Sequence, residues 1–301
     1  MGYAKPAGTS LSEDLPGSSV HGEPALLAAE AAKTVTEMRA IEVHELTRTF
    51  GKLTAVDRLT LAVPEGSVMG LLGSNGAGKT TVIKMLTTLL EPTSGSAKVA
   101  GFDIIQRPRE VRKRIGYVPQ LLSADAALTG WENLRLFGRL NGVPRAELRA
   151  RVQETLDFMG LADAANRLVR SYSGGMIRAL EIGQSMLHRP AVLFLDEPTV
   201  GLDPNARHGV WGRILELVQK SGTTVLLTTH DMEEADALCD DIALMHQGKL
   251  VAHGSPEELK AAQGPEASLE DVFIHYTGGK IQDGGTYRDI ARTRRTAHRI
   301  S

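Results

Sequence analysis

A glycine-rich segment between residues 73 and 80 points most directly to chemistry. It consists of Gly73, Ser74, Asn75, Gly76, Ala77, Gly78, Lys79 and Thr80. This order matches G-x-x-x-x-G-K-[ST], in which glycines let backbone N–H groups turn inward around phosphate oxygens. Lys79 can then reach the terminal phosphates, and the Thr80 hydroxyl can ligate Mg²⁺. The segment predicts a site for a nucleoside triphosphate, which an ATPase, a GTPase or a small-molecule kinase would use.

A second candidate group lies at Asp196 and Glu197, directly after the apolar run Ala191–Leu195. A carboxylate at the tip of a buried strand can hold Mg²⁺, and its neighbour can polarise an attacking water as a general base. We assign Asp196 to the first role and Glu197 to the second. A GTPase normally reads guanine with Asn-Lys-x-Asp, and no asparagine precedes a lysine in this chain. The missing guanine-reading segment disfavours a GTPase, and further motifs must decide between the remaining classes.

The elements that must position these groups can be read from the apolar pattern. Short runs at Ser67–Leu72, Ala191–Leu195, Thr224–Leu227 and Ile242–Met245 are continuous, as in parallel strands buried on both faces. Stretches with helical spacing separate them, so we expect an α/β nucleotide-binding core with a parallel sheet. A mostly helical insert is predicted at about residues 121–180.

Composition limits the classes of protein that remain. The 301 residues carry a formal net charge of -2, which gives no overall basic field for nucleic-acid binding, so no nucleic-acid partner is expected. The single cysteine, Cys239, excludes an internal disulfide and fits a reducing compartment. No apolar stretch is long enough to cross a bilayer and no signal peptide is evident, so another chain must supply any membrane-spanning part.

Further motifs follow in a fixed order. Gln120 ends the segment Gly116–Gln120, and Ser173, Gly174 and Gly175 open an apolar helical stretch within Tyr-Ser-Gly-Gly-Met. Asp203 lies in Gly-Leu-Asp-Pro, and His230 ends a further motif, Thr-Thr-His. From about Ile41 to Gly254 the chain therefore resembles the ATP-binding-cassette (ABC) ATPases, the nucleotide-binding subunits of ABC transporters. Tyr172 and Met176 depart from that family's Leu-Ser-Gly-Gly-Gln.

The resemblance implies an ABC ATPase architecture: a P-loop NTPase core with a parallel sheet, a small antiparallel β subdomain and the helical insert. It also implies roles for individual residues. The implied nucleotide-binding set is Phe50, which stacks on adenine, together with Gly73 to Thr80 and Thr81. The implied catalytic residues are Glu197, His230 and Gln120. The implied Mg²⁺ ligands are Thr80, Asp196 and Gln120. Ser173, Gly174 and Gly175 would contact the phosphate bound by a second subunit, and Asp203 would communicate across the same homodimer.

The segment Leu269–Ile274, followed by Thr277-Gly278, resembles the tail of the daunorubicin-resistance and nodulation-export branch. That branch implies a separate ABC-2 type permease, an export cargo that is a drug or lipid-like, and a peripheral location on the cytoplasmic face of the membrane. Two rivals stand beside this reading: a soluble ABC ATPase not coupled to transport, and a regulatory module without turnover.

The expected organisation has four parts. Residues 1–40, rich in Gly, Ser and Pro, read as a disordered extension, and 41–254 as the ABC ATPase domain. Residues 255–281 form a C-terminal extension. The last part, 282–301, is a basic flexible tail, which is either a solvated segment or a tether to acidic lipid head groups.

Overall fold

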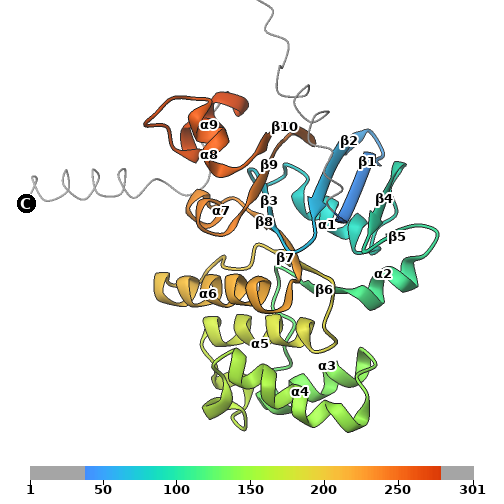
Figure 1. Cartoon of the computed structure of the whole chain (residues 1–301), viewed down its shortest axis with the longest axis vertical. Helices are drawn as coiled ribbons and strands as arrows, with labels where there is room; N and C mark the ends of the chain where they lie inside the picture. Colours follow the sequence, from blue (N-terminus) through green and yellow to red (C-terminus); the bar gives the residue numbers. More distant parts are fainter. Residues whose placement is uncertain (1–37, 279–301) are drawn as a thin grey trace, which may run out of the picture. The chain divides into compact units, whose positions relative to one another are not determined.

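A computed structural model describes residues 38–278 of the chain (Figure 1). The expected extension at 1–40, apart from its last three residues, lies outside the described residues, as does the basic tail at 282–301. Strand β1 begins at Arg39, two residues before the Ile41 boundary that we predicted. None of the helices between residues 38 and 278 has the length and apolar character needed to cross a membrane.

The chain alternates strands and helices through most of this range. The strands are β1 (Arg39–Phe50), β2 (Leu53–Pro64), β3 (Val68–Leu72), β4 (Ser94–Val99), β5 (Phe102–Asp103), β6 (Ile115–Val118), β7 (Val192–Asp196), β8 (Thr224–Thr229), β9 (Asp241–His246) and β10 (Lys249–Gly254). The helices are α1 (Lys79–Leu86), α2 (Pro108–Arg114), α3 (Gly130–Leu140), α4 (Arg145–Phe158), α5 (Gly174–Met186), α6 (Pro204–Ser221), α7 (Met232–Leu238), α8 (Pro256–Ala261) and α9 (Leu269–Thr277). Short 3₁₀ turns occupy Ala162–Ala164 and Val169–Ser171.

The strands form two sheets. The larger has the order β10-β9-β3-β8-β7-β6, in which β9, β3, β8, β7 and β6 run parallel and β10 pairs antiparallel with β9. The smaller is antiparallel, with the order β2-β1-β4-β5. The prediction of a parallel core with a small antiparallel β subdomain is therefore confirmed.

The central strands of the larger sheet are buried on both faces, which explains their continuous apolar runs. On β7, Leu193 and Leu195 pack into a core shared with α4, α5 and α6. The alternate residues Val192 and Phe194 pack into a second core with α1 and the antiparallel sheet. Because successive side chains of a strand point to opposite faces, one short segment joins both cores. The residue that follows it, Asp196, is fixed at the carboxyl end of the sheet.

Helices α3, α4 and α5 pack together, and α5 also packs against α6 (Figure 1). Thr129 begins α3 with a capping box, in which its side chain accepts from the backbone of Glu132 and the Glu132 carboxylate accepts in return. Helix α4 buries Leu148, Val152 and Leu156, which lie four residues apart on one face. Leu136 of α3, by contrast, is 42% exposed.

Cys239 closes α7 and packs against β3 at a point of close approach. A Cβ atom built on Gly70 would lie 2.6 Å from the Cys239 sulfur, so only glycine fits there without a shift. Burial raises the pKa of the Cys239 thiol, which is therefore a packing group rather than a reactive one. Beyond it, α9 packs against α7 and α8 through the buried Leu269, Val272 and Phe273.

Candidate active site

The glycine-rich loop connects the buried strand β3 to the start of α1. Gly78 precedes the helix with φ 104°, and a Cβ there would lie 2.4 Å from the Ala55 carbonyl oxygen, so the turn requires glycine. No side chain caps α1 and no acidic residue lies in its first turn. The N–H groups and the positive end of the helix therefore face the loop, where they can bind an anion.

Lys79 is buried beneath this loop, with 4% of its surface exposed. Its ammonium donates to the carbonyl oxygens of Gly73 at 2.7 Å and Ser74 at 3.2 Å, and lies 3.6 Å from Oε1 of Glu197. Burial lowers the pKa of Lys79, and the nearby carboxylates of Glu197 and Asp196 oppose that shift. The loop thus folds around the ammonium group of Lys79.

Asp196 connects the loop to the central strands. Its Oδ1 accepts from the Thr80 hydroxyl at 3.1 Å and from the Thr228 hydroxyl at 2.6 Å, and the residue is 1% exposed. Thr80 lies in the first turn of α1 and Thr228 near the end of β8, so three separate elements meet at one carboxylate. A hydroxyl beside a carboxylate is an oxygen donor pair of the kind that Mg²⁺ accepts together with phosphate and water. The residues therefore fit the predicted ion.

Glu197 has an uncommon backbone conformation for a non-glycine residue, with φ 48°. Its N–H is held by both the carbonyl and the hydroxyl oxygens of Thr228, at 3.1 and 3.0 Å. This turn directs the carboxylate toward Gln120, whose Nε2 donates to Oε2 at 2.9 Å, and toward His230, whose Nδ1 lies 3.3 Å from Oε1. Strain of this kind persists where the surroundings impose it, as at functional sites.

The electrostatics of this group follow from the contacts. The hydrogen bond from His230 is the main cause that lowers the pKa of Glu197, with Lys79 adding to it against the effect of burial. The same hydrogen bond raises the pKa of His230. Glu197 is therefore ionised at neutral pH, as a general base must be before it takes a proton.

Phe50 lies at the end of β1 and is 45% exposed. The guanidinium carbon of Arg48 lies 4.5 Å from the ring centroid. A partly exposed aromatic ring with a cation beside it can present an open surface for stacking, as the predicted adenine contact requires.

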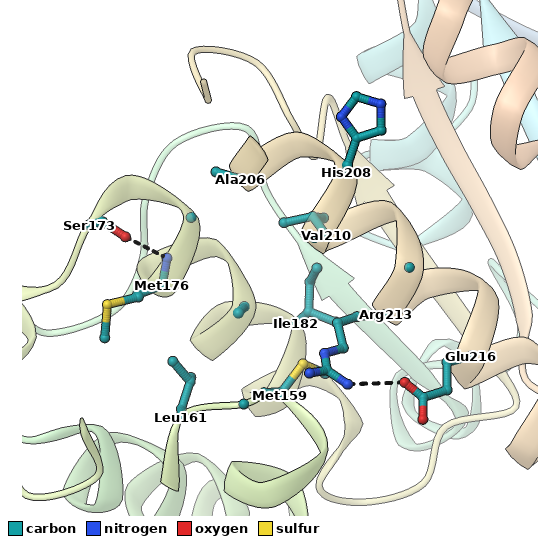
Figure 2. Close-up of a pocket in the computed structure, with 15 residues that line it drawn as sticks. Met159, Leu161, Ser173, Met176, Ile182, Ala206, His208, Val210, Arg213 and Glu216 are labelled. Carbon is teal, nitrogen blue, oxygen red and sulfur yellow. Dashed lines mark hydrogen bonds and ion pairs between the residues drawn. The ribbon is translucent and has the colours of Figure 1, made fainter. Parts of the chain in front are cut away.

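Ser173 and Asp203 lie on other elements and each serves its own helix. Ser173 caps α5, accepting from the backbone N–H of Met176 at 3.3 Å, and Figure 2 shows both beside a pocket of about 500 Å³ between α5 and α6. Asp203 caps α6, accepting from Ala206 at 3.0 Å. Tyr172, one of the two departures from the family pattern, has a structural cause: it is buried, and its hydroxyl donates to the Ala164 carbonyl at 2.7 Å.

The structure thus brings together the side chains of Lys79, Gln120 and His230 around the predicted base Glu197, with Asp196 and Thr80 beside them. Sequence reasoning missed Thr228, which bonds both acidic residues, although it lies in the same Thr-Thr-His motif that was singled out for His230. It also missed Glu234, a buried carboxyl that accepts from Thr199 at 2.6 Å and from the Trp211 indole at 3.0 Å. A glutamate inside an acidic helix gives no sequence signal for burial.

The chain is similar to known proteins in sequence and in fold. A family model described as "ABC transporter" matches residues 56–200. The chain is 50% identical to the daunorubicin/doxorubicin resistance ATP-binding protein DrrA of Streptomyces peucetius, over 75% of this chain and 68% of that one. It is 44% identical to the Nod factor export ATP-binding protein I of Ralstonia nicotianae, over 73% and 68% of the two chains.

Among solved structures, an ATP-binding subunit of an ABC transporter superposes with a TM-score of 0.70 and 29% identity. That match covers 79% of this chain and 99% of the solved one. A second, cbiO1 from Clostridium perfringens, gives a TM-score of 0.69 with 27% identity, covering 75% and 92%.

Proposed function

This chain belongs to the ABC transporter family as an ATP-binding, ATP-hydrolysing subunit, and from that premise we propose that it drives export of a drug or lipid-like compound through a separate permease of the ABC-2 type. One observation carries the ATPase part: Lys79, Gln120 and His230 converge on the carboxylate of Glu197. The export part is supported by relatives whose names refer to daunorubicin resistance and to Nod factor export.

In this proposal, different side chains of the chain bind ATP and promote its hydrolysis. The loop Gly73–Thr81 and the start of α1 hold the phosphates, while Lys79 exchanges its carbonyl partners for phosphate oxygens and Phe50 stacks on adenine. Thr80 and Asp196, with the amide of Gln120, would hold Mg²⁺, which neutralises phosphate charge when bound. Glu197 takes a proton from the attacking water, and Gln120 and His230 orient that water and the terminal phosphate.

A second copy of the chain completes the site. Ser173, Gly174 and Gly175 open α5 at an exposed position, and their N–H groups suit contact with a phosphate presented by another subunit. Asp203 would lie at the same homodimer interface. ATP then closes the dimer, and hydrolysis reopens it.

Membrane attachment comes through the permease. Leu121 and Leu122 follow Gln120 and are 81% and 58% exposed, an apolar pair at the surface directly beside a site residue. Apolar side chains exposed next to one another mark sites of protein contact. We place the permease here, so that the chain works peripherally on the cytoplasmic face.

We also propose the following division of the chain. Residues 41–254 form the ATPase domain, with the helical insert at about 121–180, and 255–281 form the C-terminal extension.

The test is purification of the full chain from native membranes in mild detergent. The wild-type chain should retain a multi-spanning membrane protein, and Leu121→Ser/Leu122→Ser should lose it while still binding ATP. Leu53→Ser is a matched control, because Leu53 is 67% exposed but is the first residue of β2, in the antiparallel sheet. A chain that is fully ATPase-active yet recovered without any membrane partner would instead be a soluble ABC ATPase.

A further inference from the structure

A buried ion pair lies on α5, outside the group around Glu197. The Arg178 guanidinium and the Glu181 carboxylate are 3.1 Å apart, with side-chain exposures of 4% and 1%. Taking two charges out of water costs several kcal/mol for each ion, and replacing such a pair by apolar residues is often neutral or stabilising. Stability alone therefore does not account for the pair, and its remaining hydrogen bonds indicate what it holds.

Those bonds all go to the segment that contains Gln120. Arg178 donates to the carbonyl oxygen of Pro119 at 2.8 Å and to that of Gln120 at 3.1 Å. Glu181 accepts from the backbone N–H groups of Ser123 and Ala124 and from the Ser123 hydroxyl. The pair therefore forms hydrogen bonds to the backbone on both sides of the two exposed leucines, Leu121 and Leu122.

Gln120 is held at both ends. Its backbone carbonyl accepts from Arg178, while its side chain donates to Oε2 of Glu197 at 2.9 Å. A guanidinium fork that bonds two successive carbonyls fixes the direction of the peptide plane as well as its position. Any displacement of α5 along its axis must move Gln120 relative to the Glu197 carboxylate.

The same helix begins at Ser173, which the proposed dimer places against the phosphate of the other subunit. We propose that Arg178 is a positioning residue for Gln120, and that the Arg178–Glu181 pair makes α5 the link by which phosphate contact at Ser173 is transmitted to Glu197 of the same chain. This inference rests on the proposed dimeric ATPase. It gives each subunit a route from the nucleotide held by its partner to its own catalytic base.

The experiment compares steady-state ATP hydrolysis and ATP affinity among matched variants of the full chain. Arg178→Lys keeps the charge but loses the fork. Arg178→Met/Glu181→Leu removes both charges together, so that neither is left buried alone. The control is Arg213→Met/Glu216→Leu, because Arg213 and Glu216 form an i,i+3 pair of the same type at 3.0 Å on α6, with side-chain exposures of 36% and 33% (Figure 2).

We expect Arg178→Lys to lower kcat by about tenfold, as a misplaced reacting group does, with the Kd for ATP changed less than twofold. The double variant should also lower kcat while leaving the Kd for ATP nearly unchanged, and its Tm should stay close to that of the wild type. The α6 control should keep the wild-type kcat. Because Arg178 acts through Gln120, Arg178→Lys combined with Gln120→Ala should be no slower than Gln120→Ala alone.

Three results would overturn the inference and leave the proposed function intact. The first is a wild-type kcat in Arg178→Lys, and the second is a loss of kcat that adds in full to that of Gln120→Ala. The third is a fall of activity in parallel with Tm in both Arg178 variants, without a loss of kcat at constant Kd for ATP. That result would make the pair purely structural. If Gln120→Ala itself hydrolyses ATP normally, the role assigned to Gln120 fails, and the inference fails with it.

Discussion

Lys79 and Glu197 form a buried ion pair, with 3.6 Å between Nζ and Oε1. The ammonium that we propose binds phosphate therefore contacts the carboxylate that we propose activates water. Each group holds the other in its charged form. We expect binding and hydrolysis to be coupled at this pair, because a phosphate that draws Lys79 away leaves His230 as the remaining partner of Oε1.

The first prediction concerns Glu197→Gln. The amide keeps the shape of the side chain but cannot accept a proton, so kcat should fall on the order of a hundredfold or more. ATP affinity should stay the same or rise, because Lys79 no longer has a competing carboxylate. Isothermal titration with ATP and a phosphate-release assay measure the two effects separately. Turnover at the wild-type rate would remove Glu197 from the role of base.

Lys79→Ala should weaken nucleotide binding itself. Loss of a charge-assisted contact to phosphate corresponds to an increase in Kd of about tenfold to a hundredfold. Lys84→Ala is the matched control, because Lys84 lies on the same helix α1 but is exposed. Equal ATP affinity in the two variants would contradict the loop as the phosphate site.

Complementation between two inactive chains tests the composite site. Ser173→Asp keeps a good cap for α5 but sets a negative charge against the phosphate, so this variant and Lys79→Ala should each be inactive. In a mixed dimer, one site joins the intact loop of one chain to the intact Ser-Gly-Gly of the other. Equal mixing should restore about a quarter of the wild-type rate, as expected for a two-fold dimer. A mixture as inactive as its components would refute the shared site.

The His230–Glu197 pair predicts a particular dependence of stability on pH. The raised pKa of His230 means that its contribution is present below the ordinary histidine pKa of about 6.5 and is lost as pH rises through the raised value. The lowered pKa of Glu197 means that its contribution is present above about 4.3 and is lost as pH falls through the lowered value. The pair therefore stabilises most between these two limits.

His230→Gln isolates this contribution, because glutamine keeps a hydrogen-bond donor but does not titrate. Urea unfolding of both proteins from pH 5 to pH 9 should show the largest difference in the free energy of unfolding at the acidic end. That difference should shrink as pH rises. A difference that stays constant across the range would show that protonation of His230 does not stabilise the fold.

The contact between Trp211 and Glu234 gives a prediction about stability. Trp211→Phe removes the indole donor from a buried carboxyl, which should lower the free energy of unfolding by about 1–3 kcal/mol. Trp131→Phe is the control, because the indole of Trp131 is only partly buried and makes no side-chain hydrogen bond recorded among residues 38–278. Equal losses in the two variants would assign the effect to packing rather than to the hydrogen bond.

The fold was predictable where a pattern is local. The runs at Ala191–Leu195 and Thr224–Leu227 lie within or beside β7 and β8, because a strand buried on both faces leaves a continuous apolar signature. Strand β4 (Ser94–Val99) was missed, since most of its residues are exposed and carry no such signature.

The candidate site divides in the same way. The order of motifs pointed to Lys79, Asp196, Glu197 and His230, which the structure gathers in one place. It gave no indication of Arg178 or Glu181, because their partners lie 57 to 59 residues earlier in the chain. Such contacts depend on how α5 packs against β6 and the segment after it, and one sequence does not encode that register in any local pattern.

Cys239 has a practical consequence. It is the chain's single cysteine, and its sulfur packs against Gly70 where reagents in solvent do not reach it. The natural chain therefore serves as its own background for thiol labelling. A cysteine introduced at the exposed Leu140 or Leu53 would be the one position that takes a spin label or fluorophore. Paired probes on two copies would then report, as an interprobe distance, how far the subunits travel during each cycle of ATP turnover.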